Sequence, residues 1–449
     1  MNLQNLRGKK IAIWGMGKEG HSSIKYLRKN FPHQQITLID DQTPPNTILE
    51  SFLQYQPVDF KIHGTSVQLL SSFDIIIKSP GISIYLPEIK AAQQNGVIFT
   101  SATNLWFDAI GNDRVIAVTG TNGKTTTASI LAYLLTESGL SVALGGNTGT
   151  PLLDLLENQN RYDIWVIELS SYQTCDLDSW PEIGILLNLY PEHIQWHGSL
   201  ENYYKDKLNL FIDNQCQAIV NFLDPISKKY TSNWEKTTYF NIPSKFHFKN
   251  DLVYEKDRPI LALANLKLVG RHNLSNICAV LTALDMLRIN VSKVIPKLSN
   301  FRGLPHRLQV LGEKDNITYI DDSISTTPES AMAAIESFRG QPITILLGGQ
   351  NRQQQYMPLI KMICDIPIHS VITMYETGPR IAELVQNKKP NSNHQPILNE
   401  SDSLEEAIIA AKNITPQGGI ILLSPAAPSY DAFSNYQERG TSFKQLAGF

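Results

Sequence analysis

Residues 114–127 carry the side chains best suited to chemistry in this chain of 449 residues. The segment reads Arg-Val-Ile-Ala-Val-Thr-Gly-Thr-Asn-Gly-Lys-Thr-Thr-Thr, which predicts a β-branched strand, a loop of small residues and a helix that begins in hydroxyls. Such a loop directs backbone N–H groups and the positive end of a helix at one point, and so binds phosphate. Lys124 adds a charge for the terminal phosphates, and the Thr125 hydroxyl is placed to ligate Mg²⁺. We therefore expect a nucleoside triphosphate on this loop, which comprises Gly120, Thr121, Asn122, Gly123, Lys124, Thr125 and Thr126.

Three residues beyond the loop could act on the same triphosphate. Glu168 ends a predicted strand at 163–168, where an acid can reach the metal; the alternative is a helix cap or a surface acid. His193 follows the next predicted strand, at 183–188, and would equally suit capping or packing. Lys207 would by itself be a solvated helix lysine. The position of the first two residues matters, because ligand groups collect at the carboxyl ends of strands in open α/β sheets.

A second glycine pattern lies near the N-terminus. Gly15-x-Gly17-x-x-Gly20 follows a predicted strand at 10–14, and Asp40 ends the next predicted strand. The glycines permit a tight turn, the helix end takes a pyrophosphate and Asp40 can accept from a ribose. The pattern could serve NAD or another ligand with a pyrophosphate and a ribose, including a UDP-sugar. The alternative is a glycine turn without a ligand.

Two loops near the C-terminus also follow predicted strands. Asp321 and Asp322 come directly after the strand at 318–320, and Thr327 is a predicted helix N-cap, with Pro328 and Glu329 in the first turn. The loop at 424–431 is rigid and bears hydroxyls, which suits it to hold a carboxylate. Ordinary turn chemistry is the alternative for both loops.

Composition places the chain among soluble globular enzymes, with 42% hydrophobic residues, 18% charged residues and a formal net charge of -3. No basic excess indicates nucleic acid, and no apolar run approaches the roughly 18 residues that span a bilayer. The first ten residues lack the apolar core of a signal peptide. The four cysteines are widely spaced, without metal-ligand pairing or a disulfide pattern. We expect free thiols and a cytoplasmic protein.

Short apolar strands alternate with helical patterns along the whole chain, which predicts parallel α/β sheets. We expect three consecutive α/β domains: a Rossmann-like domain at 1–103, a central P-loop domain at 104–302 and a second Rossmann-like domain at 303–449. Within the central domain, residues 221–259 are polar and aromatic, which indicates an irregular or antiparallel insertion before a helix at about 273–287. The other predicted strands are at 35–39, 73–77, 343–347, 370–373 and 419–423.

Five motifs occur in an order that resembles the Mur ligases of peptidoglycan synthesis. They are Gly120-Thr-Asn-Gly-Lys-Thr125, Glu168-Leu-Ser-Ser171, Gly270-Arg-His-Asn-Leu-Ser-Asn276, Leu304-Pro-His-Arg307 and Asp321-Asp-Ser323. The dinucleotide-like first domain and the segment 423–440 resemble the glutamate-adding members. The resemblance spans all three predicted domains.

The resemblance implies three groups of site residues. The UDP part of the substrate would be bound by Gly15, Gly17, Lys18, Asp40, Ser79, Pro80 and Gly81, with Asn147 near the pyrophosphate. ATP would be bound by the phosphate loop together with Asn273, Asn276, Arg307 and Asp322, and Mg²⁺ by Thr125, Glu168, His193 and Lys207. Glutamate would be bound by Thr326, Arg352, Ser429 and Tyr436.

The resemblance also implies a reaction. A carboxylate of UDP-N-acetylmuramoyl-L-alanine would attack the γ-phosphate of ATP, and the amine of glutamate would attack the resulting acyl phosphate. Lys124, His193 and Lys207 would be catalytic, with Lys207 carbamylated. Lys205 is a weaker candidate, considered because His193 and Lys207 are one residue closer than the family pattern. Positioning and charge neutralisation should dominate such catalysis. We expect a monomer that acts on small molecules, without nucleic acid or membrane as partner.

Three residues depart from the pattern of the D-glutamate-adding ligases. Ile324 stands where a lysine is common, Arg352 where a lysine is frequent and Tyr436 where a phenylalanine is common. All three fall in the acceptor region, so they leave the ATP site intact and the stereochemistry of the glutamate open. D-glutamate is the default expectation and L-glutamate the alternative. An NAD-dependent oxidoreductase is the rival from another class, but it leaves Lys124, Glu168 and Asp322 without a role.

Overall fold

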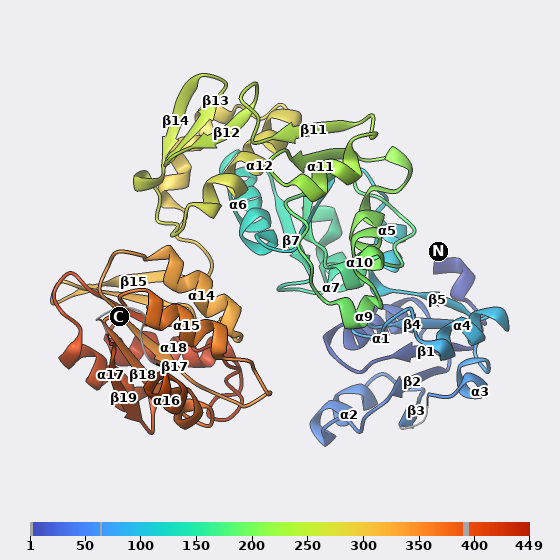
Figure 1. The fold of residues 1–449 in the computed structure, drawn as a ribbon. Coiled ribbons are helices and arrows are strands. Elements are labelled where there is room, and N and C mark those ends of the chain that lie inside the picture. The colour runs from blue at the N-terminus through green and yellow to red at the C-terminus, as the bar shows by residue number, and fades with distance from the viewer. Residues whose placement is uncertain (1–2, 63–64, 389–394) are drawn as a thin grey trace. The chain divides into compact units, whose positions relative to one another are not determined.

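The computed structural model describes residues 3–62, 65–388 and 395–449, and within them three sheets built on parallel strands confirm the predicted α/β class (Figure 1). The chain forms two compact units. Unit 1 comprises residues 1–261 and 274–297, and unit 2 comprises residues 262–273 and 298–449. In the described part of the chain, no helix combines the length and apolarity that crossing a bilayer requires.

The first sheet has the strand order β3-β2-β1-β4-β5, with all strands parallel. Its strands are β1 (Ile11–Trp14), β2 (Ile36–Asp40), β3 (Val58–Ile62), β4 (Ile75–Lys78) and β5 (Ile98–Thr100), and its helices are α1 (Lys18–Asn30), α2 (Asn46–Leu53), α3 (Val67–Leu70) and α4 (Pro87–Gln94). The three predicted strands are β1, β2 and β4, each buried along nearly its whole length. The edge strands β3 and β5 escaped prediction because half-exposed and polar residues interrupt their apolar pattern.

The second sheet, also in unit 1, has the order β11-β10-β9-β6-β8-β7. Its strands are β6 (Val115–Thr119), β7 (Val142–Gly146), β8 (Ile164–Glu168), β9 (Ile183–Leu186), β10 (Gln217–Asn221) and β11 (Thr237–Phe240). The helices of this part are α5 (Ala102–Ile110), α6 (Lys124–Glu137), α7 (Leu152–Leu155), α8 (Ser171–Thr174), α9 (Ile194–His197), α10 (Leu200–Leu208), α11 (Pro225–Thr231), α12 (His272–Met286) and α13 (Val291–Val294). Helix α12 confirms the helix predicted at about 273–287.

The prediction of an insertion at 221–259 was wrong for its first part. Strands β10 and β11 pair in parallel and extend the central sheet, with α11 between them. Antiparallel pairing begins only in the small sheet β12 (Phe246–Lys249), β13 (Leu252–Glu255) and β14 (Arg258–Ala262). The sequence misled because β11 (Thr-Thr-Tyr-Phe) lies at the sheet edge, where its residues stay half-buried and need no apolar run.

The first two sheets pack together within unit 1. A single cluster of buried side chains runs from Leu6 to Val220 and includes Trp106, whose ring centroid lies 5.4 Å from that of Trp165 in an edge-on arrangement. The fully buried Lys78 ammonium, at the end of β4, forms a 3.0 Å ion pair with Asp176, just beyond α8. A buried charge is tolerated only when it is paired, so this ion pair fixes the two sheets to each other.

The third sheet forms unit 2, with the order β15-β16-β20-β17-β18-β19. Its strands are β15 (Gln309–Lys314), β16 (Ile317–Asp321), β17 (Ile343–Leu347), β18 (Ser370–Met374), β19 (Ile397–Ser401) and β20 (Ile420–Leu423), and its helices are α14 (Pro328–Ser337), α15 (Met357–Asp365), α16 (Gly378–Asn387), α17 (Leu404–Ile414) and α18 (Tyr436–Ala447). Among the described strands of this sheet, only β15 is antiparallel to its neighbour. Thr327 caps α14 by accepting from the Ser330 N–H, as predicted.

We predict that Gly20→Ala destabilises the protein by about 1–3 kcal/mol, because a Cβ at residue 20 would lie 2.0 Å from the Gly15 carbonyl oxygen. Urea unfolding, followed by tryptophan fluorescence, would measure the loss. Gly17→Ala is the matched control on the same turn, where a Cβ meets no atom within 4 Å. Equal midpoints for the two variants would contradict the packing of α1 against the turn.

Candidate functional site

The phosphate loop has the geometry that its sequence predicts. Strand β6 ends at Thr119, and α6 begins at Lys124 directly after Gly123, which adopts a left-handed conformation with φ +86°. The first N–H groups of a helix have no partner within the helix, so the N-terminal end of α6 is suited to meet an anion. The Lys124 ammonium folds back and donates to the carbonyls of Gly120 and Thr121, at 2.9 Å each.

Residues from two other elements hold the loop in this shape. The Asn188 side chain, just after β9, accepts from the Asn122 N–H at 2.8 Å and donates to the Asn122 carbonyl at 3.0 Å. The Tyr203 hydroxyl, from α10, lies 2.8 Å from the Thr121 hydroxyl. We did not predict either role. The position of Asn188 after a central strand was the only signal in the sequence.

Lys207 lies against the loop rather than in solvent. Its side chain is 2% exposed, and its ammonium donates to the Gly120 carbonyl at 3.0 Å, the oxygen that also accepts from Lys124. Burial and the neighbouring Lys124 charge lower the pKa of Lys207 to about 7. A large fraction of its amine is therefore neutral and nucleophilic near neutral pH. Lys205, the weaker candidate, is exposed on the same helix.

Glu168 sits among oxygen donors at the carboxyl end of β8. It is 3% exposed, and its carboxylate accepts from the Asn147 amide and the Thr148 hydroxyl at 2.9 Å each. The Thr148 hydroxyl in turn lies 3.4 Å from that of Thr125. A carboxylate beside two hydroxyls is the donor set that Mg²⁺ prefers, so these residues fit the predicted metal. Thr148 was missed in the sequence, where nothing distinguishes it from other loop threonines.

His193 is the N-cap residue of α9 and adopts a left-handed conformation with φ +55°. Its Nε2 lies 3.5 Å from Glu192, and its ring centroid lies 4.8 Å from that of Tyr172. Burial lowers the pKa of His193, and the Lys207 and Lys124 charges act in the same direction against the opposing effect of Glu192. His193 therefore lies in the field of both lysines, and its neutral ring is favoured.

The predicted UDP-binding residues gather at the carboxyl edge of the first sheet. The Ser79 hydroxyl donates to the Gly15 carbonyl at 3.3 Å, and a Cβ at residue 15 would lie 2.5 Å from that hydroxyl. Asp40 accepts from the Met16 N–H at 2.9 Å and so orders the glycine turn. Gly17, Lys18 and Gly81 are exposed around them, and Pro80 is half-buried. A carboxylate has further lone pairs, so Asp40 keeps the capacity to accept from a ribose.

Two of the predicted nucleotide residues lie near the start of α12. Asn276 belongs to unit 1, and its side-chain oxygen would lie 2.6 Å from a Cβ at Gly123, so it contacts the phosphate loop directly. Asn273 belongs to unit 2, where its side chain donates to the Val269 carbonyl at 2.7 Å.

Unit 2 holds the remaining nucleotide residues. Asp322 is 3% exposed and accepts from the Leu308 N–H at 3.1 Å and the Ser424 hydroxyl at 2.8 Å. Burial raises the pKa of Asp322 to about 6, although these hydrogen bonds and the Arg307 charge oppose the rise. Arg307 is exposed and close enough to act on this carboxylate.

The predicted glutamate residues lie on three loops at one edge of the third sheet. The loops follow β16, β17 and β20, which are neighbours, and they are joined by the Asp322–Ser424 hydrogen bond and by one of 2.8 Å from the Gln350 N–H to the Pro428 carbonyl. Arg352 is exposed, with its guanidinium 5.4 Å from the Tyr430 ring centroid. The other three predicted residues are placed as follows: Thr326 is half-buried, Ser429 is buried and Tyr436 begins α18.

This arrangement defines a class of enzyme. A phosphate loop, a glycine turn of the dinucleotide-binding type and a third group of loops fit an ATP-dependent ligase that forms amide bonds. Comparison with protein families supports the class along most of the chain. Residues 9–101 match the Mur ligase MurD-like N-terminal domain, residues 118–284 the Mur ligase middle domain and residues 306–427 the Mur ligase glutamate ligase domain.

The chain belongs to the Mur ligase family, and it is therefore an ATP-dependent ligase of peptidoglycan synthesis. It is 38% identical to the UDP-N-acetylmuramoyl-L-alanine--L-glutamate ligase of Xanthomonas campestris pv. campestris, over 100% of this chain and 97% of that protein. Proteins of the same name from Xylella fastidiosa and Salinispora tropica are 38% and 32% identical, over 100% and 99% of this chain and 97% and 98% of theirs.

Solved structures show the same fold at lower sequence identity. The UDP-N-acetylmuramate-alanine ligase MurC from Thermotoga maritima is 18% identical, with a TM-score of 0.58 over 98% of this chain and 99% of that one. The MurF ligase from Thermotoga maritima, solved in complex with ADP, is 17% identical, with a TM-score of 0.58 over 92% of this chain and 95% of that one. The likeness confirms the predicted α/β fold class.

We predict that Gly123→Ala weakens ATP binding at least about tenfold, a loss of about 1.4 kcal/mol, because its Cβ would press on Asn276 at the phosphate loop. Titration calorimetry would measure the dissociation constant. Gly139→Ala is the matched control: its φ of +93° imposes similar backbone strain, but its Cβ meets no atom within 4 Å. If both variants bound ATP alike, the contact with Asn276 would have no part in the site.

Proposed function

We propose that this ligase joins L-glutamate to UDP-N-acetylmuramoyl-L-alanine at the expense of ATP. The observation that carries the proposal is the set of relatives that bear this activity in their names, which align with the chain from end to end at up to 38% identity. D-glutamate was the default expectation from the sequence, and these relatives move our proposal to the alternative that the sequence left open.

The acceptor loops favour the same choice. Ile324, which replaces a lysine common in the D-glutamate ligases, is half-buried, with its N–H bonded to the His306 carbonyl at 3.1 Å. A cation is thereby removed from one loop, while the Arg352 guanidinium projects from another loop beside Tyr430. The enantiomers of glutamate place the amine, the α-carboxylate and the side-chain carboxylate in mirror-image order around Cα. Because both carboxylates are anions, the loss of one cation from the acceptor region alters which of the two arrangements is favoured.

The proposed reaction has two steps. A carboxylate oxygen of the UDP-linked alanine attacks the γ-phosphorus of ATP, which forms an acyl phosphate and releases ADP. The amine of L-glutamate then attacks the acyl carbon, expels inorganic phosphate and loses a proton to leave the amide. Neither step needs a covalent enzyme nucleophile, so Lys124 and the donors of α6 act by holding the phosphates and neutralising charge.

Mg²⁺ would be held by Thr125 and Glu168, with His193 and the carbamate of Lys207 as further ligands. The metal supplies charge neutralisation at the transferring phosphoryl group. A carbamate would turn the cation of Lys207 into an anion, in keeping with a buried amine beside Lys124. Our proposed domains, 1–103, 104–302 and 303–449, would bind the UDP substrate, ATP and glutamate respectively.

We predict that phosphate release from ATP requires both UDP-N-acetylmuramoyl-L-alanine and L-glutamate, and that D-glutamate supports far less. A coupled phosphate assay with each isomer, and with each substrate omitted, would measure the rates. A preference for D-glutamate would refute the proposed stereochemistry alone. No release with either isomer would refute the proposed reaction.

We also predict that Lys207→Ala reduces turnover by about 10²-fold or more and that formate or acetate partly restores it, because a small carboxylate can occupy the space of the carbamate. Lys124→Ala is the matched control, since it removes a cation that no carboxylate can replace. Rescue of Lys124→Ala, or full activity of Lys207→Ala, would contradict the roles proposed for the two lysines.

A further inference from the structure

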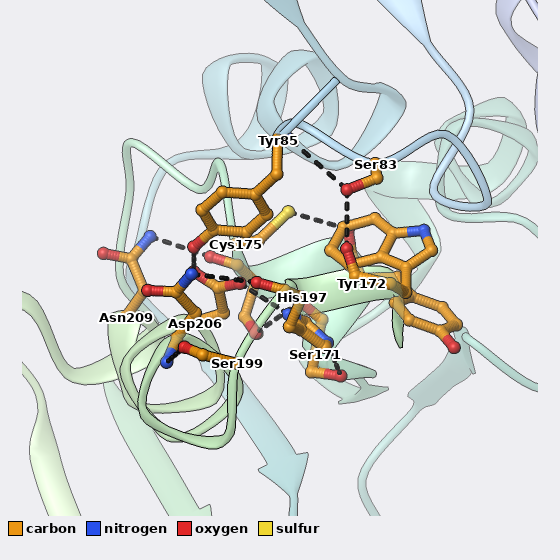
Figure 2. A network of polar contacts seen from close by, with 12 residues as sticks. Ser83, Tyr85, Ser171, Tyr172, Cys175, His197, Ser199, Asp206 and Asn209 are labelled. Atoms are coloured by element: carbon orange, nitrogen blue, oxygen red, sulfur yellow. Dashed lines mark hydrogen bonds and ion pairs between the residues drawn. The ribbon is translucent and has the colours of Figure 1, made fainter. Parts of the chain in front are cut away.

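A network of buried and half-buried polar side chains joins the first sheet of unit 1 to the second (Figure 2). The Tyr85 hydroxyl, from the loop between β4 and α4, donates to Oδ1 of Asp206 on α10 at 2.9 Å. Asp206 Oδ2 accepts from His197 Nδ1 at 2.5 Å, and His197 Nε2 lies 3.0 Å from the Ser171 hydroxyl. Ser171 begins α8, shortly after Glu168 ends β8. The network therefore extends from the loop next to the proposed UDP-binding residues to the end of β8, which carries Glu168.

The same loop is fixed at two further points on α9. The Trp196 indole donates to the Gly81 carbonyl at 2.8 Å, and the Ser83 hydroxyl donates to the Trp196 carbonyl at 2.6 Å. Gly81 belongs to the segment Ser79-Pro80-Gly81 that we propose to contact the UDP substrate. The position of that segment is therefore tied to the helices that follow His193.

Asp206 is the residue on which this connection depends. Its carboxylate is 4% exposed, and its two oxygens have partners from two different elements. A buried carboxylate has to be paired and hydrogen-bonded, because leaving it without partners is costly. His197, which is fully buried, depends on Asp206 in the same way, since Asp206 fixes its tautomer and its ring orientation.

Helix α10 carries the proposed metal-binding residue directly beside Asp206. Consecutive side chains point about 100° apart on a helix, so Asp206 faces Tyr85 and His197 while Lys207 faces the Gly120 carbonyl. A rotation or slide of α10 would disturb both contacts together. The position of Lys207 is therefore constrained from the UDP side of unit 1 as well as from the phosphate loop.

We propose that Asp206, held by Tyr85 and His197, is a positioning residue. Through α10 it couples the position of Lys207 at the phosphate loop to the position of the loop proposed to bind UDP. This inference rests on the proposed function. In this proposal, the hydrogen-bonded network aligns the UDP-linked carboxylate with the ATP phosphates. No residue of the network has to touch the reacting atoms.

The test uses Tyr85→Phe in the full chain, which removes one hydroxyl and keeps the ring. We expect kcat for phosphate release to fall about tenfold, the usual effect of losing a residue that orients a ligand, with KM for ATP unchanged. We also expect a weaker ¹³C carbamate signal from protein equilibrated with ¹³CO₂. The thermal midpoint should fall by only a few degrees, because Asp206 keeps its contact with His197. Tyr254→Phe, on β13 of the small antiparallel sheet, is the matched control and should match the unaltered protein.

A double-mutant cycle then identifies the path. If Tyr85 acts through Asp206, the loss in Tyr85→Phe/Asp206→Asn will be smaller than the combined losses of the single variants. Multiplicative losses, or an unchanged kcat in Tyr85→Phe, would overturn the proposal.

Hydrogen exchange supplies an arm that needs no substrate. Tyr85→Phe should raise amide exchange in residues 200–208, whereas Tyr254→Phe should not. This measurement does not depend on turnover. If the protein releases no phosphate but Tyr85→Phe still raises exchange in α10, the proposed reaction is wrong and the positioning role stands. Unchanged exchange in α10 would overturn the positioning role even in an enzyme that turns over.

Discussion

The carbonyl oxygen of Gly120 accepts from two lysines, Lys124 of α6 and Lys207 of α10, and the central site is built around that arrangement. It requires glycine, because φ is +152° and a Cβ would lie 2.9 Å from Leu187. Burial lowers the pKa of Lys207, and the repulsion between two ammonium groups on one oxygen lowers it further. The Lys124 ammonium is then the cation of the loop that can meet a polyphosphate.

Side chains from neighbouring elements hold other polar groups around this oxygen. Asn188 fixes the peptide of Asn122, Tyr203 fixes Thr121, and Asn147 with Thr148 fixes Glu168. Each supporting side chain comes from a different strand end or helix than the group it holds. Such a site is organised before its ligands arrive, which lowers the reorganisation needed during the reaction.

Local signals carried the successful predictions from sequence. The phosphate loop, the cap at Thr327 and the helix α12 each depend on residues that are close together in sequence. Their local residue patterns were therefore enough to predict them. The contacts of Tyr85 with Asp206 and of Thr148 with Glu168 could not be read, because partners far apart in sequence are brought together only by packing. The strand β11 failed for a related reason, since its place at the sheet edge decides its pattern. The residues around Lys207 predicted a solvated helix lysine, but in the fold its side chain is buried.

The ion pair between Lys78 and Asp176 bears on how such ligases can diverge. Lys78 belongs to the first sheet, and Asp176 follows a helix packed on the second. If the first sheet alone were exchanged for that of a relative without the lysine, Asp176 would lose its ion-pair partner. Breaking a buried pair in this way costs about 3–5 kcal/mol, a large part of the stability of a typical domain. Recombination between family members should therefore keep these two sheets together, because a crossover between them would produce a less stable protein.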